Sequence, residues 1–342
     1  MNHMHREILS APDLLAGTYR ENLPRVKALA EQTSRRGISA IHIAARGSSA
    51  NAGLYFAYLC EVCAGIPVHM LMPSVLTLYG GALGLGKDLL LAITQGGRGG
   101  DVKFLVDAAR AQGALTAAIC NEEDSPVARA ADLLLPMKLG IEQAMAATKT
   151  FTAEMLLGGM LAYALAGRDP GCFDRVPRLL REVYAMEDRL AEAAEGWTTV
   201  RSCYVLARGY QLAIAREVCC KLQEACFVNA SPFSQADFLH GPLAMIEPGD
   251  RVIYMHREDA TGPFSLELLE RIEAAGAKVL LLTDSPELAA RREDALLLPR
   301  EEEHLAPFAF AGACQLFACR LAVKKGLNPD QSRNLNKYTV TL

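Results

Sequence analysis

Short apolar runs alternate with helix-like segments along the chain, and the whole alternation occurs twice. Asp88–Ile93 is matched by Asp250–Met255, which begins 162 residues later. At the same offset, Ile41–Gly47 and Val205–Gly209 each predict a buried strand that runs into a glycine turn. Strands that are apolar along their whole length, alternating with helices, are typical of parallel sheets covered on both faces. The pattern predicts an α/β fold of two tandem three-layer α/β/α sandwiches, each with a five-stranded parallel sheet.

The length of 342 residues suits two such domains of about 150 residues each. Placing the boundaries between the repeated patterns predicts five parts. They are a helical N-terminal segment at 1–32, a first domain at 33–172, a linker helix at 173–196, a second domain at 197–333 and a C-terminal tail at 334–342.

Composition narrows the function classes. A formal net charge of −4 gives no general attraction for nucleic acid or an anionic membrane, so neither is expected as a partner. The first ten residues carry no apolar core, so no secretory signal is expected and the protein is predicted to be cytoplasmic. The ten cysteines lie mostly in apolar, helix-like stretches, which favours free buried thiols over a metal site.

Three segments of the first repeat are predicted at strand ends, where parallel sheets bind ligands. Ala45–Asn51 brings hydroxyls to the start of a helix, and Thr94–Asp101 is a glycine-rich turn with one arginine. Ala146–Thr152 opens the closing helix of this repeat. The first two segments are not specific alone, because a glycine-rich turn after a strand is common in α/β proteins. Thr94–Asp101 has the alternative of a flexible turn with Asp101 as a helix cap, and Ala146–Thr152 has the alternative of a capping sequence.

The second repeat holds a group of charged residues. Lys221 and Glu224 are three positions apart and share one helix face, where a solvated salt bridge is the usual explanation. His240 precedes a Gly-Pro turn. The polar end of the chain, Arg333–Thr341, has the composition of a frayed terminus.

Taken together, these segments resemble the sugar-isomerase (SIS) domain family, and most of all the tandem isomerase half of glucosamine-6-phosphate synthase and its shorter relatives. The resemblance covers nearly the whole chain. The motifs that carry it are Arg46-Gly47-Ser48-Ser49, Ala147-Thr148-Lys149-Thr150-Phe151-Thr152, Lys221-Leu222-Gln223-Glu224, His240-Gly241-Pro242-Leu243-Ala244 and Arg333-Asn334-Leu335-Asn336-Lys337.

The resemblance implies roles for four residues. Glu224 would move a proton between C1 and C2 of the sugar, and Lys221 would tune it. His240, which the family supplies across a homodimer, would assist ring opening. Lys337 would approach C1 or C2 and could form a Schiff base. No metal or organic cofactor is implied.

The resemblance also implies a set of residues that line the phosphate and sugar, but one loop departs from the family pattern. Gly96 and Gly99 stand where two hydroxyl residues are usual. A hydrogen bond to a charged phosphate is worth roughly 1.5–3 kcal/mol, so their loss would weaken binding unless backbone N–H groups and Arg98 compensate. The expected lining residues are Gly47, Ser48, Ser49, Thr94, Gln95, Gly96, Gly97, Arg98, Gly99, Ala147 and Thr148.

These implications give a functional hypothesis with alternatives. The expected activity is a phosphosugar isomerase/deaminase that converts an amino-hexose 6-phosphate to a ketose phosphate, with a sugar phosphate as its small-molecule partner. No glutaminase domain fits before Ile41, so glutamine-dependent synthesis is not expected. A non-catalytic phosphosugar-binding regulator and a sugar-phosphate deglycase remain the alternatives.

Overall fold

The structure is a computed structural model that describes residues 1–337. The chain divides into two compact units. Within the described residues, the N-terminal unit comprises Ser10–Glu142, Lys149–Pro177 and 334–337. The C-terminal unit comprises Met1–Leu9, Gln143–Thr148 and Arg178–Arg333. Each unit is built around its own parallel sheet.

The sheet of the N-terminal unit has five parallel strands in the order β2-β1-β3-β4-β5. Their carboxyl ends therefore share one edge of the sheet, where ligands bind in folds of this kind. The strands are β1 (Ile41–Ala44), β2 (Val68–Met70), β3 (Leu89–Thr94), β4 (Leu115–Cys120) and β5 (Leu133–Pro136).

The sheet of the C-terminal unit repeats this topology in the order β10-β9-β8-β6-β7, again all parallel. The two sheets confirm the predicted α/β fold. The linker expected at 173–196 contains two helices rather than one, α7 (Val176–Tyr184) and α8 (Glu187–Glu195). The strands are β6 (Ser202–Ala207), β7 (Asn229–Ser234), β8 (Arg251–His256), β9 (Lys278–Thr283) and β10 (Leu296–Leu297).

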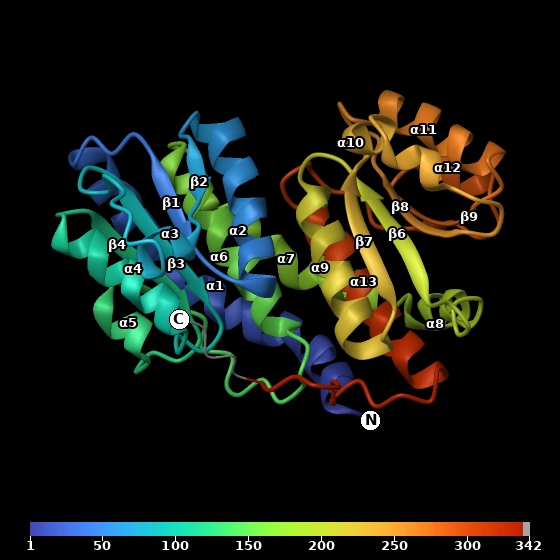
Figure 1. The fold of residues 1–342 in the computed structure, drawn as a ribbon, viewed down its shortest axis with the longest axis horizontal. Helices are drawn as coiled ribbons and strands as arrows, with labels where there is room; N and C mark the ends of the chain where they lie inside the picture. The colour runs from blue at the N-terminus through green and yellow to red at the C-terminus, as the bar shows by residue number, and fades with distance from the viewer. Residues whose placement is uncertain (338–342) are drawn as a thin grey trace. The chain divides into compact units, whose positions relative to one another are not determined.

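Helices cover both faces of the first sheet, because its strands carry apolar side chains on both sides. Ile43 of β1 lies against Gly53 of α2, whereas its neighbour Ala44 joins the apolar cluster under α4. On the α2 face, α2 packs against α6 (Figure 1). The helices are α1 (His3–Arg35, which begins in the other unit), α2 (Gly47–Leu59), α3 (Pro73–Thr77), α4 (Gly100–Ala111), α5 (Pro126–Ala130) and α6 (Lys149–Leu165).

The second sheet is covered in the same way. Figure 1 shows α9 beside the strands β6 and β7, and α13 packs against α9 and α8. On the other face, Tyr254 of β8 packs with Leu268 and Ile272 of α11. The remaining helices are α9 (Gln211–Cys226), α10 (Gln235–Leu239), α11 (Gly262–Ala274), α12 (Pro286–Ala290) and α13 (Ala306–Lys324).

Helix α13 is long and apolar enough to cross a membrane by composition alone. Within the C-terminal unit, however, 89% of its apolar window is buried. Side chains of α13 meet those of α7, since an added Cβ at Gly312 would lie 3.0 Å from Leu180. Its apolarity is therefore that of a core helix.

Candidate functional site

The glycine-rich loop after β3 forms a tight connection into α4. Thr94 ends the strand, and its Oγ1 accepts a hydrogen bond of 3.1 Å from the backbone N–H of Gly97. Gly97 has φ +62°, and an added Cβ would lie 1.9 Å from Oγ of Ser125, so only glycine fits. Gly99 is the N-cap of α4 and offers no side-chain cap. The loop thus presents backbone N–H groups at a helix N-terminus, an arrangement that suits an anion.

The charged side chains around this loop are engaged with other loops of the same sheet edge. Arg98 is exposed, and its Nε and Nη2 donate to Glu122 at 3.0 and 2.8 Å. The buried Asp101 accepts a hydrogen bond of 2.8 Å from Nε of Arg46. The Arg98–Glu122 ion pair therefore links the loop after β3 to the loop after β4. The hydrogen bond between Arg46 and Asp101 links the loop after β1 to the start of α4.

The loop after β1 enters α2 through Gly47, which has φ +53°. Ser48 is half-buried at the first turn of this helix. Ser49 is buried, and its hydroxyl donates to Oε1 of Glu154 on α6 at 2.7 Å. In this arrangement the Ser49 hydroxyl serves the contact between α2 and α6, and Ser48 is the more accessible of the two.

Glu142 is a buried carboxylate on which several polar groups converge, and the sequence did not single it out. It accepts hydrogen bonds from Nε2 of Gln95 at 2.8 Å and from the hydroxyl of Thr150 at 2.6 Å. The Nζ of Lys337 lies 3.8 Å from the same carboxylate. Glu142 therefore brings together two residues expected in the site, Gln95 at the end of β3 and Lys337 in the tail.

The segment before α6 is fixed by the buried Lys149. Its Nζ donates to the carbonyl oxygens of Leu139 and Ile141, at 3.2 and 2.8 Å, which shapes the chain that leads to Glu142. Ala147 is half-buried. The fully buried Thr148 uses its carbonyl to accept a hydrogen bond of 3.2 Å from Gln315 of α13, in the C-terminal unit.

In the C-terminal unit, α9 carries an ionic group of Glu217, Lys221 and Glu224 on one face. The Nζ of Lys221 lies 2.9 Å from Oε2 of Glu224 and 3.2 Å from Oε1 of Glu217. The side chains of Lys221 and Glu217 are buried, at 1% and 3% exposed, whereas Glu224 is 29% exposed. Of the two carboxylates, Glu224 is thus the one that an external reactant can reach.

Lys221 stays charged in this position. Burial alone would lower the pKa of the ammonium, but attraction from Glu217 and Glu224 outweighs burial and raises its pKa above 10.5. Because the pKa of Lys221 is higher in the folded state than in the unfolded state, its ion pairs contribute fully to stability below pH 10.5. This contribution is lost only above that pH. Lys221 is therefore positively charged throughout the neutral pH range, and its ammonium keeps the carboxylate of Glu224 in position.

His240 lies at the end of α10, where its backbone N–H donates to the carbonyl of Asp237 at 3.0 Å. The residue is exposed and precedes a 3-10 turn at Pro242–Met245. Among residues 1–337, no hydrogen bond or ion pair joins His240 to Lys221 or Glu224. The structure thus brings Lys221 and Glu224 together and leaves the imidazole of His240 at the surface.

Comparison with known proteins places this arrangement in a family. The SIS domain model matches residues 36–164 and 198–325, one match on each sheet. The chain belongs to the SIS domain family. The resemblance drawn from the sequence motifs is thereby confirmed, and the two sheets are two tandem SIS domains.

The relatives include enzymes of sugar phosphate metabolism. The chain is 30% identical, over 98% of its length, to a glutamine–fructose-6-phosphate aminotransferase (isomerizing) of Leifsonia xyli, and it spans 58% of that relative. A solved protein of Silicibacter pomeroyi, provisionally described as a phosphosugar isomerase, is 29% identical with a TM-score of 0.86, covering 96% of this chain and all of that one. A glucosamine-6-phosphate deaminase of Thermotoga maritima shares the fold, with a TM-score of 0.81 at 20% identity, covering 99% of this chain and 100% of that one.

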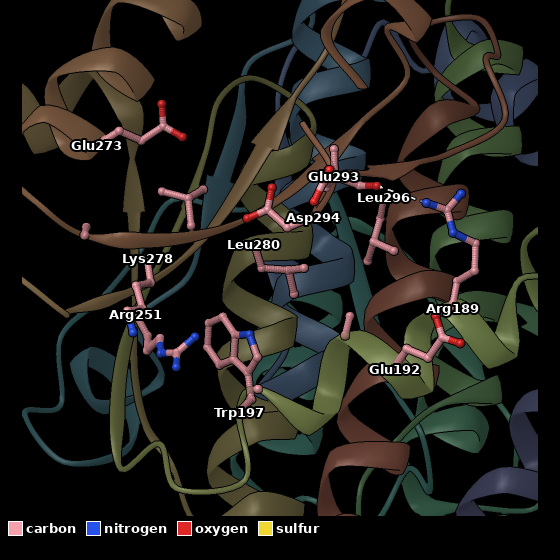
Figure 2. Close-up of a pocket in the computed structure, with 15 residues that line it drawn as sticks. Arg189, Glu192, Trp197, Arg251, Glu273, Lys278, Leu280, Glu293, Asp294 and Leu296 are labelled. Atoms are coloured by element: carbon pink, nitrogen blue, oxygen red, sulfur yellow. Dashed lines mark hydrogen bonds between the residues drawn. The ribbon is translucent and has the colours of Figure 1, made fainter. Parts of the chain in front are cut away.

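The C-terminal SIS domain also contains a cavity of ≈ 650 Å³ at the amino ends of its strands. Figure 2 shows Trp197, Arg251 and Lys278 on one side of it and Glu293 and Asp294 on another (Figure 2). It opens at the edge opposite the carboxyl strand ends, so it is distinct from the edge where SIS-type sheets are expected to bind substrate.

A substitution at Glu142 tests its structural role in the N-terminal SIS domain. Glu142→Gln is expected to lower the free energy of unfolding by about 1.5–3 kcal/mol, because the polar groups around this site face a charged acceptor that the neutral amide replaces. Urea denaturation measures the change. Glu123→Gln, at an exposed position, is the control and should change stability by less than about 0.5 kcal/mol. Equal stability of the two variants would contradict the role given to Glu142.

Proposed function

We propose that this SIS-domain chain is a phosphosugar isomerase/deaminase acting on an amino-hexose 6-phosphate, of the type that converts glucosamine 6-phosphate to fructose 6-phosphate. The observation that carries the proposal is the Lys221–Glu224 pair, in which a buried cation holds a partly exposed carboxylate. The isomerizing activity in the name of the Leifsonia xyli relative supports the same chemistry.

The proposed reaction moves one carbon-bound proton from C2 to C1 and releases one molecule of ammonia. In the open-chain aminosugar, the carboxylate of Glu224 takes the proton from C2, the electrons of the broken C–H bond form a C1–C2 double bond, and O1 takes a proton from water, which gives an enolamine. The protonated Glu224 returns its proton to C1 and the nitrogen loses a proton to water, which leaves a ketimine at C2. Water then adds to C2 and the C–N bond breaks, giving the ketose phosphate and ammonia. Without the amino group, the same proton transfer is an aldose–ketose isomerisation.

The phosphate is proposed to bind at the loop after β3 of the N-terminal SIS domain. Support comes from Thr94 at the strand end and from the backbone N–H groups at the start of α4. Arg98 forks onto Glu122, so its charge is partly neutralised. Because Gly96 and Gly99 carry no hydroxyl, we expect a lower affinity for phosphate than in family members that have hydroxyl residues at these positions.

Lys337 and His240 have proposed roles at the sugar. The amine of Lys337, beside Glu142, would orient the C1–C2 region or form a Schiff base there. His240 would shuttle the proton of O5 during ring opening, and its exposed position suits a contribution to the site of a second copy. The proposal therefore includes a homodimer. It also places the protein in the cytoplasm.

Adding a hydroxyl at Gly99 tests the phosphate-binding role of the loop. Gly99→Ser is expected to lower the Kd for glucosamine 6-phosphate about ten- to a hundredfold, the effect of one hydrogen bond to a charged group. The added Cβ would lie 3.3 Å from Oδ1 of Asp101, so only a small shift is needed.

Isothermal titration calorimetry measures this change in affinity. Gly84→Ser, where an added Cβ meets nothing within 4 Å, is the matched control and should leave Kd unchanged. An unchanged Kd in Gly99→Ser would mean that the phosphate does not lie at this loop.

The proposed function is tested by combining binding with turnover. Thermal shifts are measured with hexose 6-phosphates, amino-hexose 6-phosphates and the unphosphorylated sugars, and ammonia release is assayed for each ligand that stabilises the protein. Stabilisation by glucosamine 6-phosphate together with ammonia release is the expected result. Binding without turnover would favour a non-catalytic phosphosugar regulator, and release of an amino acid from a glycated substrate would favour a deglycase.

A further inference from the structure

The charged side chains that line a second cavity of the C-terminal SIS domain are all positive. It measures ≈ 730 Å³ and opens where β6 and β7 begin. Its eight lining residues all fall within the described part of the chain. They include the cations Arg201, Lys325 and Arg333, and no acidic side chain is among them. We propose that this cavity is a binding site for a phosphate dianion, either free or carried by a small phosphomonoester.

Two of these cations have no partner to neutralise them. Within residues 1–337, neither the guanidinium of Arg201 nor that of Arg333 makes a hydrogen bond or ion pair, and both residues are exposed. Arg333 stacks on the ring of Phe227, with 4.2 Å from Cζ to the ring centroid. Stacking occupies the face of the guanidinium and leaves its N–H groups, which lie in the plane, available to an anion.

The ordinary explanation of these cations is that they neutralise helix ends. The carboxyl ends of α9 and α13 both reach this cavity, at Phe227 and Lys325. Each helix end is equivalent to about −0.5 of an elementary charge, or about −1 for the two. Three full positive charges exceed this, which leaves a surplus of about +2. That surplus matches the charge of a phosphate dianion.

The backbone and ring of Phe227 place the guanidinium of Arg333 at the cavity. It has φ +53°, a left-handed conformation that costs a bulky residue roughly 1–2 kcal/mol and that glycine adopts freely at helix ends. The ring holds Arg333 in place at the cavity. The hydroxyls of Thr198 and Thr199 line the same space and add neutral donors.

The charges that line the cavity in Figure 2 do not favour an anion. Its charged lining residues are Arg189, Arg251 and Lys278 against Glu192, Glu273, Glu293 and Asp294. With cations and carboxylates interspersed, it gives no reason to prefer an anion. The contrast within one domain singles out the cationic cavity.

The site would also act on the tail of the chain. Arg333 is four residues before Lys337, so an anion held by Arg333 would fix the start of the segment that carries this lysine. Anion binding itself does not depend on the proposed function, because the cavity is lined by neither Glu224 nor the loop after β3.

The test compares phosphate binding by three forms of the full chain. They are the wild type, Arg201→Ala/Arg333→Ala, and the control Arg291→Ala/Arg300→Ala, which removes the same charge from exposed positions of the same domain outside the cavity. Inorganic phosphate and glycerol 3-phosphate are titrated separately at pH 8 and constant ionic strength. Calorimetry measures affinity, and fluorescence of Trp197, next in sequence to Thr198 and the one tryptophan of the chain, reports the local change.

The wild type and the control should show a binding event that is at least about a hundredfold weaker in Arg201→Ala/Arg333→Ala, as expected for two lost charged hydrogen bonds. Tighter binding of glycerol 3-phosphate would identify a phosphomonoester as the ligand, and tighter binding of inorganic phosphate would identify free phosphate. The event should survive Thr94→Val, which separates it from the substrate loop. Wild-type affinity in the cavity variant, or no binding by the wild type, would overturn the proposal.

Discussion

Glu224→Gln is expected to lower kcat for an amino-hexose 6-phosphate by about 10²–10⁴-fold while leaving the fold intact. The amide cannot take the proton from C2, yet its carbonyl oxygen can still accept the hydrogen bond that Lys221 Nζ donates at 2.9 Å. Because Glu224 is 29% exposed, the loss of its charge should cost little stability. Steady-state kinetics together with the melting temperature measure both effects.

The control for this experiment is Glu247→Gln, which removes an exposed carboxylate from the same SIS domain. It should keep wild-type kcat and melting temperature. Turnover of Glu224→Gln within about threefold of the wild type would refute the assignment of Glu224 as the base, because removing a general base costs at least about a hundredfold.

Lys221→Met is expected to lower the free energy of unfolding by about 3–5 kcal/mol, because it removes the buried cation that lies 3.2 Å from the buried carboxylate of Glu217. Glu224 would also lose the group that positions it, so kcat should fall with stability. Denaturant unfolding gives the first quantity and steady-state kinetics the second. A stability loss below about 1 kcal/mol would contradict the buried position of the pair.

A second substitution separates folding from function at this position. In Lys221→Met/Glu217→Leu both buried charges are replaced by apolar side chains, a change that is often neutral for stability. The double variant should recover most of the lost stability. Its kcat should stay low, because the cation beside Glu224 is still missing. Recovery of kcat together with stability would mean that Lys221 has a purely structural role.

The sequence predicts the central strands because they are buried on both faces and therefore apolar throughout. Strands such as β3 and β8 contain apolar runs, Leu89–Ile93 and Val252–Met255, that carry the signal. The strands β2 and β7 lie at sheet edges, and this position permits the exposed His69 in β2 and Pro232 in β7. Their polar or proline-containing sequences carry no such signal, so they were not predicted.

The site was only partly predictable for a related reason. The spacing of Lys221 and Glu224 predicted that they share one helix face, but only the family resemblance implied a role in the site, and the burial of Lys221 was not predicted. Glu142 and Glu217 were missed, because a single acidic residue in a loop or helix has the same sequence signal whether it is solvated or buried. The pairing of Arg98 with Glu122 joins the loops after two different strands, so it depends on the folded sheet.

The central claim is that the chain moves a proton between C1 and C2 of a sugar phosphate, and deuterium exchange tests it most directly. Fructose 6-phosphate and glucosamine 6-phosphate are each incubated with the protein in D₂O, and the sugar carbons are followed by NMR. The account predicts deuterium at C1 of fructose 6-phosphate with the wild type and none above background with Glu224→Gln. Binding of either sugar without any deuterium incorporation by the wild type would contradict it.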